Sequence, residues 1–479
     1  MMISARRGRC GGGIAAMLGL QLGFLATAFA GEPWAERTQA LGAIAEIPTG
    51  VLSKNDLTRL VGTGEALFGA HFTTLDGVGR PQATQAIDPT RRKHPPEQMF
   101  VRTAGPDAGS CSSCHNQPAM GGAGDFVTNV FASEGFESAD FDSLDPQFSS
   151  ERGTNHIFGA GLVELLAREM SHELQAIRDK ALSQARTGDA TVRFQLETKG
   201  VEFGFISAEA DGSVNLDELD GVDTDLVIRP FSQKGVMTSL RQFTINALNQ
   251  HHGMQADERF GARWTGSDDF DGDGKSAEIS AADVSALVAW QATLPAPVRM
   301  VPEIDGWAEA ADRGEAVFTD LGCTSCHRPA LPLESLSFAD PGPSDLAGTL
   351  NDRQIGAMAV YDIALMDWVE DLPRDDQGRV LVPLFGDLKR HVMTDNQIDA
   401  LGNELLSQRF VDRNIFQTAE LWGVGSTQPY GHRNDFSSLN DIILAHGGAG
   451  RATRDAYAAA PDAEKSALIA FLKTLVIVP

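Results

Sequence analysis

Two copies of a Cys-x-x-Cys-His motif constrain this chain more than any other feature of its sequence. Two cysteines three positions apart can form thioether bonds to the vinyl groups of one haem, and the adjacent histidine can bind the iron from one face. The motifs therefore predict two covalently bound haem c groups with histidine proximal ligands. The motif residues are Cys111, Cys114 and His115 in the first copy and Cys323, Cys326 and His327 in the second.

The remaining cysteine, Cys10, lies in an N-terminal segment with the features of a secretory signal. Arginines precede an apolar stretch over residues 14–29, and small residues near position 30 fit a cleavage site. The stretch is shorter than the ~20 apolar residues that a membrane-spanning helix needs. We therefore expect residues 1–30 to be removed on export to the periplasm, with no stable membrane insertion. A redox dithiol or half of a zinc site is the alternative use of Cys-x-x-Cys. Two copies, each followed directly by His, in an exported chain with no spare cysteine, favour haem instead.

The chain is acidic, with 39 Lys and Arg against 65 Asp and Glu and a net charge of −26. Loss of the signal would remove three arginines and no acid, so the mature chain is more negative still. Nucleic acid and anionic membranes would repel such a surface. The charge is compatible with a basic or weakly charged electron-transfer partner, and equally with a well-solvated acidic surface.

A short string recurs upstream of the two motifs. Residues 64–68 read Gly-Glu-Ala-Leu-Phe and residues 314–318 read Gly-Glu-Ala-Val-Phe. This placement indicates two related units, each with the apolar pair on a helix packed near its haem. We place the first haem unit at 48–190, a connecting segment at 191–300 and the second haem unit at 301–479.

Hydrophobic periodicity predicts a mainly α chain. Alternating apolar residues on both sides of Lys199 and Gly200 predict one β-hairpin over 191–206. The expected fold is therefore two cytochrome c-like haem domains with a connecting segment that contains a small hairpin. Helices are expected at 162–186, 239–252, 280–294, 394–406, 438–446 and 461–475.

Five further strings occur in order along the chain: FGAGLVE at 158–164, DLVIRPFSQKG at 225–235, NQHHGMQ at 249–255, LWGVGSTQPYGHRND at 421–435 and LNDIILAH at 439–446. Together with the paired motifs, this set resembles the bacterial di-haem cytochrome c peroxidase superfamily. It is most similar to the branch of di-haem oxidoreductases, formerly called thiol oxidoreductases. The resemblance spans most of the mature chain.

The resemblance implies a distal ligand for the second haem. In the superfamily this ligand lies fourteen residues after the histidine of the Pro-Tyr-x-His string, which is His432 here, so the position is that of His446. A haem bound by His327 and His446 would be low-spin and suited to electron transfer. The plainer interpretation of His446 is a residue at the end of a helix, with its side chain hydrogen-bonded to the last backbone carbonyls of that helix. Met393 or His391 is the alternative ligand.

The resemblance also implies an open first haem. Peroxidases of the superfamily often carry a displaceable histidine shortly after the motif, whereas this chain has no histidine between His115 and His156. Met120 is the remaining candidate ligand. Peroxide cleavage needs a proton-moving group beside the iron, an effect worth ~10² to 10⁴ in rate. The candidates for this group are Glu164 first, then His252, His156 and His251. For the three histidines, a role in the core or on the surface is the plainer interpretation.

Residues 269–274, DFDGDG, place oxygen donors at alternate positions with a glycine at the turn, as an EF-hand-type loop does. The twelfth position is Ser280 instead of Glu, and Glu278 or Asp283 is left to close the loop. Members of the superfamily commonly hold calcium, so the expected site is a structural one, with a solvated acidic turn as the alternative. Its ligands would include Asp269, Asp271 and Asp273.

These features predict a periplasmic di-haem c-type oxidoreductase of peroxidase type. The first haem would be open to hydrogen peroxide or another small oxidant, and the second would transfer electrons. The expected partners are a small redox protein or quinol-linked electron donor and a second copy of the chain in a homodimer. The alternatives are a di-haem electron-transfer cytochrome with two six-coordinate irons and an oxygenase of the same superfamily.

Overall fold

The computed structural model describes residues 48–79, 109–125, 127–132, 149–344, 358–404 and 411–478, with isolated positions between 36 and 46 and at 81, 82 and 91. Contacts divide the chain into two units, Met1–Gly42 and Ala43–Pro479, and all elements described below belong to the second. The predicted signal segment lies outside the described residues. Within them, no helix combines the length and apolar character needed to cross a bilayer.

The fold is mixed α and β, so the prediction of a mainly α chain was wrong in part. Of the described residues, 38% lie in helices and 16% in strands. Most strands are two to four residues long, too short for a period-two pattern to be read in the sequence. The short strands are β1 (Gly50–Val51), β6 (Val214–Asn215), β7 (Val298–Arg299), β8 (Leu331–Leu333), β9 (Ser337–Asp340), β10 (Ala359–Asp362), β11 (Val380–Val382), β12 (Arg390–Val392), β13 (Ile415–Gln417) and β14 (Leu475–Val476).

These strands form small separate sheets that join distant parts of the chain. Strand β10 lies between β1 and β9, and the pairs β8–β11, β12–β13 and β7–β14 are antiparallel ribbons. The longer strands β2 (Val127–Ala132) and β3 (Ser149–Gly153) form another antiparallel pair. The sheets therefore act as ties between loops and form no central layer.

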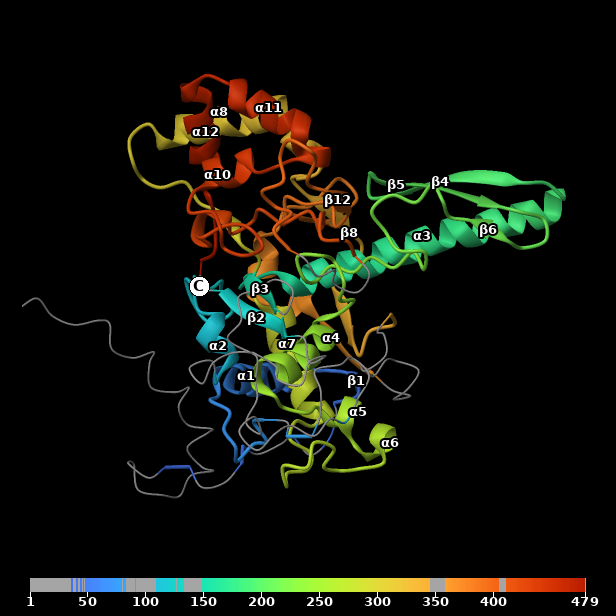
Figure 1. Ribbon diagram of the computed structural model, residues 1–479, viewed down its shortest axis with the longest axis vertical. Coiled ribbons are helices and arrows are strands. Elements are labelled where there is room, and N and C mark those ends of the chain that lie inside the picture. The colour runs from blue at the N-terminus through green and yellow to red at the C-terminus, as the bar shows by residue number, and fades with distance from the viewer. Residues whose placement is uncertain are drawn as a thin grey trace, which may run out of the picture. The chain divides into compact units, whose positions relative to one another are not determined.

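Two helix pairs repeat the same packing. Helix α1 (Lys54–Gly69) packs against α7 (Ala281–Thr293), and α8 (Trp307–Asp320) packs against α12 (Asp462–Leu472) (Figure 1). A Cβ atom on Gly64 would lie 1.9 Å from the backbone oxygen of Ala286, and one on Gly314 would lie 2.0 Å from that of Ala467. Each glycine thus lets two helix backbones meet.

The repeat extends to the partner helices. Residues 285–290 read Ser-Ala-Leu-Val-Ala-Trp in α7, and residues 466–471 read Ser-Ala-Leu-Ile-Ala-Phe in α12. Helix α7 therefore packs against α1, the helix that carries the first copy of the repeated string, although α7 lies in the segment that was predicted to connect the two haem units. The predicted boundaries near 190 and 300 stay predictions.

The predicted hairpin is present and packs on a long helix. Strands β4 (Val192–Thr198) and β5 (Val201–Ala208) pair antiparallel around Lys199 and Gly200, which both have positive φ as a two-residue hairpin turn requires. Together with β6 they cover the C-terminal half of α3 (Ala160–Gly188), where alanines allow close contact (Figure 1).

Five of the six predicted helices are confirmed, and one is wrong. The described part of the predicted helix 394–406 contains turns and no helix. The Asp395 carboxylate accepts hydrogen bonds from the backbone N–H groups of Gln397, Ile398 and Gly448, which offers the backbone an alternative to helical bonds. The remaining helices are α2 (Cys111–Cys114), α4 (Leu240–Ala247), α5 (Asp257–Phe260), α6 (Ala262–Thr265), α10 (Leu439–Leu444) and α11 (Arg451–Ala459).

Candidate di-haem site

The first Cys-x-x-Cys-His motif begins with the single-turn helix α2, which places its two cysteines on one side. Ser110 caps this turn and donates a hydrogen bond from Oγ to the Phe68 carbonyl, 3.0 Å away, which ties the motif to α1. His115 donates from Nδ1 to the Gly122 carbonyl over 3.2 Å, so its Nε2 is left for a metal. Burial lowers the pKa of His115 to about 4, and a neutral imidazole is the form that binds iron.

The second motif has the same arrangement around His327. Its ring lies 6.4 Å from that of Phe318, as the ring of His115 lies 5.9 Å from that of Phe68. Nδ1 of His327 donates to the Phe385 carbonyl over 3.2 Å. Burial, and then the neighbouring His446, lowers the pKa of His327 to about 4. The repeated string therefore places an aromatic ring beside each proximal histidine.

His446, at the end of α10, faces His327. The two ring centroids are 6.5 Å apart, with an interplanar angle of 60°. Two imidazoles that share one iron have centroids roughly 6 Å apart, because each metal–nitrogen bond is about 2 Å and each ring centre lies about 1 Å further. Nδ1 of His446 donates to the Ile442 carbonyl over 2.8 Å, which leaves Nε2 available. Burial lowers the pKa of His446 as well. The two residues fit a bis-histidine haem.

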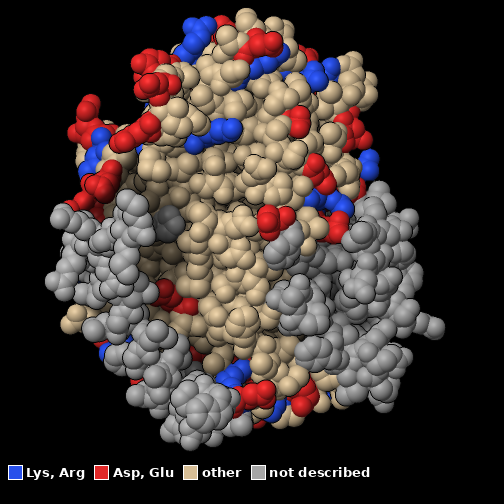
Figure 2. Space-filling model, turned by 90° about the vertical axis from the view of Figure 1, so that its left-hand side faces the viewer, with Lys and Arg blue, Asp and Glu red and all other residues tan. Residues whose placement is uncertain are grey.

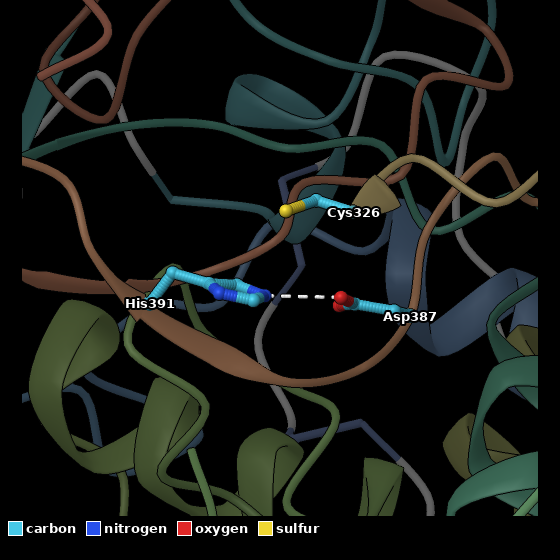
Figure 3. A group of neighbouring side chains, drawn as sticks. All are labelled: Cys326, Asp387 and His391. Carbon is cyan, nitrogen blue, oxygen red and sulfur yellow. Dashed lines mark hydrogen bonds and ion pairs between the residues drawn. The ribbon is translucent and has the colours of Figure 1, made fainter. Parts of the chain in front are cut away.

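The alternative ligands of the second haem lie nearby in different roles. His391 forms an ion pair from Nε2 to Asp387 over 3.0 Å, beside the sulfur of Cys326 (Figure 3). Burial opposes protonation of His391, but bonds to Asp387 and Cys326 outweigh it and raise its pKa to about 9. A protonated imidazole cannot bind a metal. The trio shares Cys326 with the second Cys-x-x-Cys-His motif, where this cysteine is predicted to form a thioether. Met393 and His446 both border Gly450, where a Cβ would lie 3.3 Å from the Met393 Cε and 3.1 Å from the His446 Cβ.

The two preferred proton-moving candidates lie in different surroundings. His252 ends the π-helical turn Leu248–His252, with its Nε2 3.9 Å from the Cys111 sulfur. Glu164 is fully buried on α3, where one carboxylate oxygen pairs with Arg168 and the other accepts the Leu240 N–H over 2.8 Å. The structure thus brings His252 to the first motif, while Glu164 joins α3 to the start of α4.

The other candidates also have identifiable contacts. His156 donates from Nε2 to the Trp422 carbonyl over 3.0 Å. Burial lowers its pKa to about 4, and His115 contributes electrostatically, so the two histidines are neighbours. His251 lies beside His252 with its ring centroid 6.5 Å away. Met120 lies against the last turn of α1, its sulfur 3.4 Å from where a Cβ on Gly69 would be.

Sequence reasoning missed a buried ion cluster centred on Arg241. Its guanidinium binds Glu258 at 2.6 Å and Asp340 at 2.8 Å and donates to the Ser285 hydroxyl on α7. Burial opposes the charge, but the two carboxylates outweigh it and raise the pKa of Arg241. The cluster therefore joins α4, α5, α7 and β9. An arginine in a helix with many apolar neighbours was its only signal in the sequence.

Two residues of the strings that carry the family resemblance, Lys234 and His432, make buried polar contacts. Lys234 is fully buried and donates to the carbonyls of Asp412, Arg413 and Ile415 at 2.7 to 3.1 Å. His432 lies 3.0 Å from Glu404, which also binds Arg152 at 2.8 Å. Next to these groups, the ring centroid of Phe416 lies 4.6 Å from that of His432, with the rings tilted by 40°.

The acidic loop brings its three predicted ligands together. Oxygens of Asp269, Asp271 and Asp273 all lie within 4.8 Å of one another. Of the two residues left to close the loop, Asp283 forms a capping box with Ser280 at the start of α7. Glu278 instead interacts electrostatically with all three aspartates.

Comparisons with known proteins support the resemblance. Residues 257–475 match the family model described as "di-haem oxidoreductase, putative peroxidase". No curated protein matches the chain. Hydrazine synthase of Kuenenia stuttgartiensis shares 14% identity over 93% of this chain and 100% of that chain, with a TM-score of 0.37. A MauG-like protein associated with microbial copper homeostasis shares 17% identity over 56% of this chain and 78% of that chain, with a TM-score of 0.28. Neither TM-score is high enough to establish a common fold.

The matched segment contains the second motif, His446, the helix pair α8–α12 and the acidic loop. It also contains α7, the helix that packs against α1. The match confirms the resemblance seen in the motifs: residues 257–475, somewhat less than half of the chain, match the di-haem oxidoreductase family.

Proposed function

We propose that this chain is an exported, peroxidase-like oxidoreductase with two covalently bound haem c groups, acting in the periplasm. The observation that carries the proposal is an asymmetry between the two motifs. The ring centre of His446 lies 6.5 Å from that of His327, whereas His156, the histidine neighbour of His115, donates from Nε2 to the Trp422 carbonyl over 3.0 Å. Haem would supply a redox-active iron at each motif. His327 and His446 would hold the iron at the second motif, and His115 would hold the iron at the first motif with room for a small oxidant.

At the second motif, His327 and His446 would hold the haem iron between them. Their Nδ1 atoms donate to the Phe385 and Ile442 carbonyls, which restrains both rings and leaves both Nε2 atoms available for a metal. Such paired neutral imidazoles favour a low-spin iron and leave no position for substrate. This motif would therefore transfer electrons.

At the first motif, His115 is the proximal ligand and His252 is the residue that holds the proton during turnover. His252 ends a π-helical turn beside Cys111, and such turns often occur at functional sites. Glu164 is the weaker choice, because both of its carboxylate oxygens already accept hydrogen bonds. The substrate class is hydrogen peroxide or another small oxidant.

The electron donor is a small protein or quinol-linked carrier that tolerates an acidic surface. The chain carries a net charge of −26. In Figure 2, acidic and basic side chains both lie around the edge of one face, whose middle is largely uncharged among the described residues. A basic or weakly charged donor would be attracted by the negative net charge, and raising the ionic strength should slow its reaction.

Electron paramagnetic resonance of the oxidised holoprotein tests the asymmetry. We expect one high-spin and one low-spin iron. His446→Ala should convert the low-spin signal to high-spin, while His172→Ala, a change at an exposed histidine on α3, should leave both signals unchanged. Two low-spin irons that bind neither cyanide nor peroxide would overturn the proposal and leave an electron-transfer cytochrome.

The role of His252 needs a separate measurement. His252→Ala should slow the reaction with peroxide by ~10² to 10⁴ if this residue moves the proton. The low-spin signal of the second haem should stay unchanged. Equal rates in His252→Ala and the unaltered protein would contradict the assignment. A loss seen only in Glu164→Gln would transfer it to Glu164.

A further inference from the structure

The chain leaves its helix just before His446, the proposed distal ligand of the second haem. Helix α10 ends at Leu444, two residues earlier. Gly447 and Gly448 then turn the chain away, and Gly448 has a φ of +50°. Helix ends fray readily, so the direction of a histidine at this position depends on what holds the turn that follows it.

Asp395 holds this turn, although it lies 53 residues before Gly448 in the chain. Its Oδ2 accepts the Gly448 N–H over 2.9 Å, and its two oxygens accept from Nη1 of Arg451 at 3.0 and 3.2 Å. Its Oδ1 also accepts the N–H groups of Gln397 and Ile398 at 2.8 and 3.0 Å. The N–H of Gln397, and then those of Ile398 and Gly448, lower the pKa of Asp395, so these hydrogen bonds are made to a charged carboxylate and are strong.

The segment that carries this aspartate also meets the turn backbone to backbone. The Gly447 N–H donates to the Met393 carbonyl over 3.0 Å. A Cβ on Gly447 would lie 2.5 Å from the Ile398 oxygen, and one on Gly448 would lie 2.2 Å from the Val392 oxygen. The segment therefore leaves the turn little room to shift.

A buried lysine anchors the strand pair from which this segment extends. Strand β12 pairs with β13, and the Met393 N–H continues the pairing by donating to the Asn414 carbonyl over 2.8 Å. Lys234, which is fully buried, donates to three carbonyls between residues 412 and 415. Asp395 lies three residues after the end of β12. It is thus held by a segment that the interior of the protein supports.

We propose that Asp395 is a positioning residue for His446, and that it holds the turn at Gly448 so that the imidazole stays directed toward His327. The inference rests on the proposed function, in which His446 is a haem ligand. A metal ligand has to be held within about 0.5 Å of its productive position. The Ile442 carbonyl restrains the ring from the helix side, and Asp395 restrains the backbone two residues beyond it.

Electron paramagnetic resonance and cyanide binding of the oxidised holoprotein test this role. Asp395→Ala removes every bond of the carboxylate, so we expect a high-spin fraction at the second haem and at least tenfold faster cyanide binding there. Asp395→Asn has the same shape and keeps one acceptor oxygen, so it should show a smaller high-spin fraction. If Asp395→Ala fails to fold, Asp395→Asn provides the comparison. A low-spin signal and a cyanide rate that stay unchanged in the folded variant would overturn the inference.

Asp455→Asn is the matched control, because Asp455 binds the same arginine. Its Oδ2 accepts from Nε of Arg451 over 2.9 Å, so the variant removes one ion pair of this arginine and leaves Asp395 in place. The low-spin signal should be that of the unaltered protein. A high-spin fraction as large as that of Asp395→Ala would show that the loss of an Arg451 ion pair alone causes the change, and would also overturn the inference.

The double variant with Asp395→Ala and His446→Ala distinguishes positioning from a general loss of structure. If Asp395 acts through His446, the second haem of the double variant should have the same spectrum and cyanide rate as His446→Ala alone. A further change at the second haem would show that Asp395 acts elsewhere. A low-spin signal that survives His446→Ala would instead overturn the ligand assignment of the proposed function, and this inference with it.

Discussion

Replacing Gly64 by alanine is the most direct test of the helix packing around the first motif. A Cβ at this position would lie 1.9 Å from the Ala286 oxygen and 2.8 Å from the Trp290 Cβ. Carbon–oxygen contacts are favourable only beyond about 3.3 Å, so α1 and α7 would have to separate by more than about 1 Å. Backbone atoms cannot rotate away as a side chain can.

The expected cost follows from two opposing effects. Overpacking costs typically about 1 to 3 kcal/mol, and contact with a backbone atom favours the upper end of this range. Alanine's better helix propensity offsets about 1 kcal/mol of this. We therefore expect Gly64→Ala to lower the free energy of unfolding by about 2 kcal/mol. The first haem's absorbance should shift as well, because Phe68, one turn later, contacts His115.

Gly62→Ala is the matched control on the same helix. Nothing lies within 4 Å of a Cβ at Gly62, so only the propensity effect remains there and stability should rise by up to about 1 kcal/mol. Guanidinium unfolding of both holoproteins, followed by haem absorbance, measures the difference of about 3 kcal/mol. If Gly64→Ala is as stable as Gly62→Ala, the close crossing of α1 and α7 is wrong.

Two further predictions concern buried charges. Arg241→Met should lower the free energy of unfolding by about 3 to 5 kcal/mol, because Glu258 and Asp340 would remain buried without their cation. Thermal unfolding at neutral pH measures this loss, and a change below about 1 kcal/mol would contradict the prediction. Burial, and then Asp387, raises the pKa of Glu420 to about 7 from its usual 4.5, so its protonated form is favoured in the folded state and stability should fall as pH rises from 4.5 to 7. Glu420→Gln should remove that part of the pH dependence, by at most about 3 kcal/mol, and unfolding curves of the two proteins that stay parallel across this range would refute the assignment.

Local patterns in the sequence were sufficient for the haem motifs and most helices. Strings such as 64–68 and 314–318 act over one or two helical turns, so their helices and the phenylalanines beside His115 and His327 could be predicted. The helix expected at 394–406 was wrong because Asp395 bonds Gly448, a residue far away in the chain. Strands of two to four residues leave no readable period.

Contacts between distant residues limited what could be predicted of the site. The facing of His446 and His327 was expected only from a family resemblance, because no local pattern relates the two. The choice between Glu278 and Asp283 depended on a capping box, whose Ser-x-x-Asp signature at Ser280 was visible in the sequence. The equivalence of α7 and α12 was also visible, as a shared Ser-Ala-Leu-x-Ala string.

The wide separation of α1 and α7 along the chain affects the order in which the protein matures. Cys111 and Cys114 are synthesised well before Ala281–Thr293, the helix that packs beside their motif. At 5 to 20 residues per second, this delay is on the order of ten seconds. During that interval α1 has no α7 to pack against, so the close helix crossing at Gly64 forms only after the missing helix arrives.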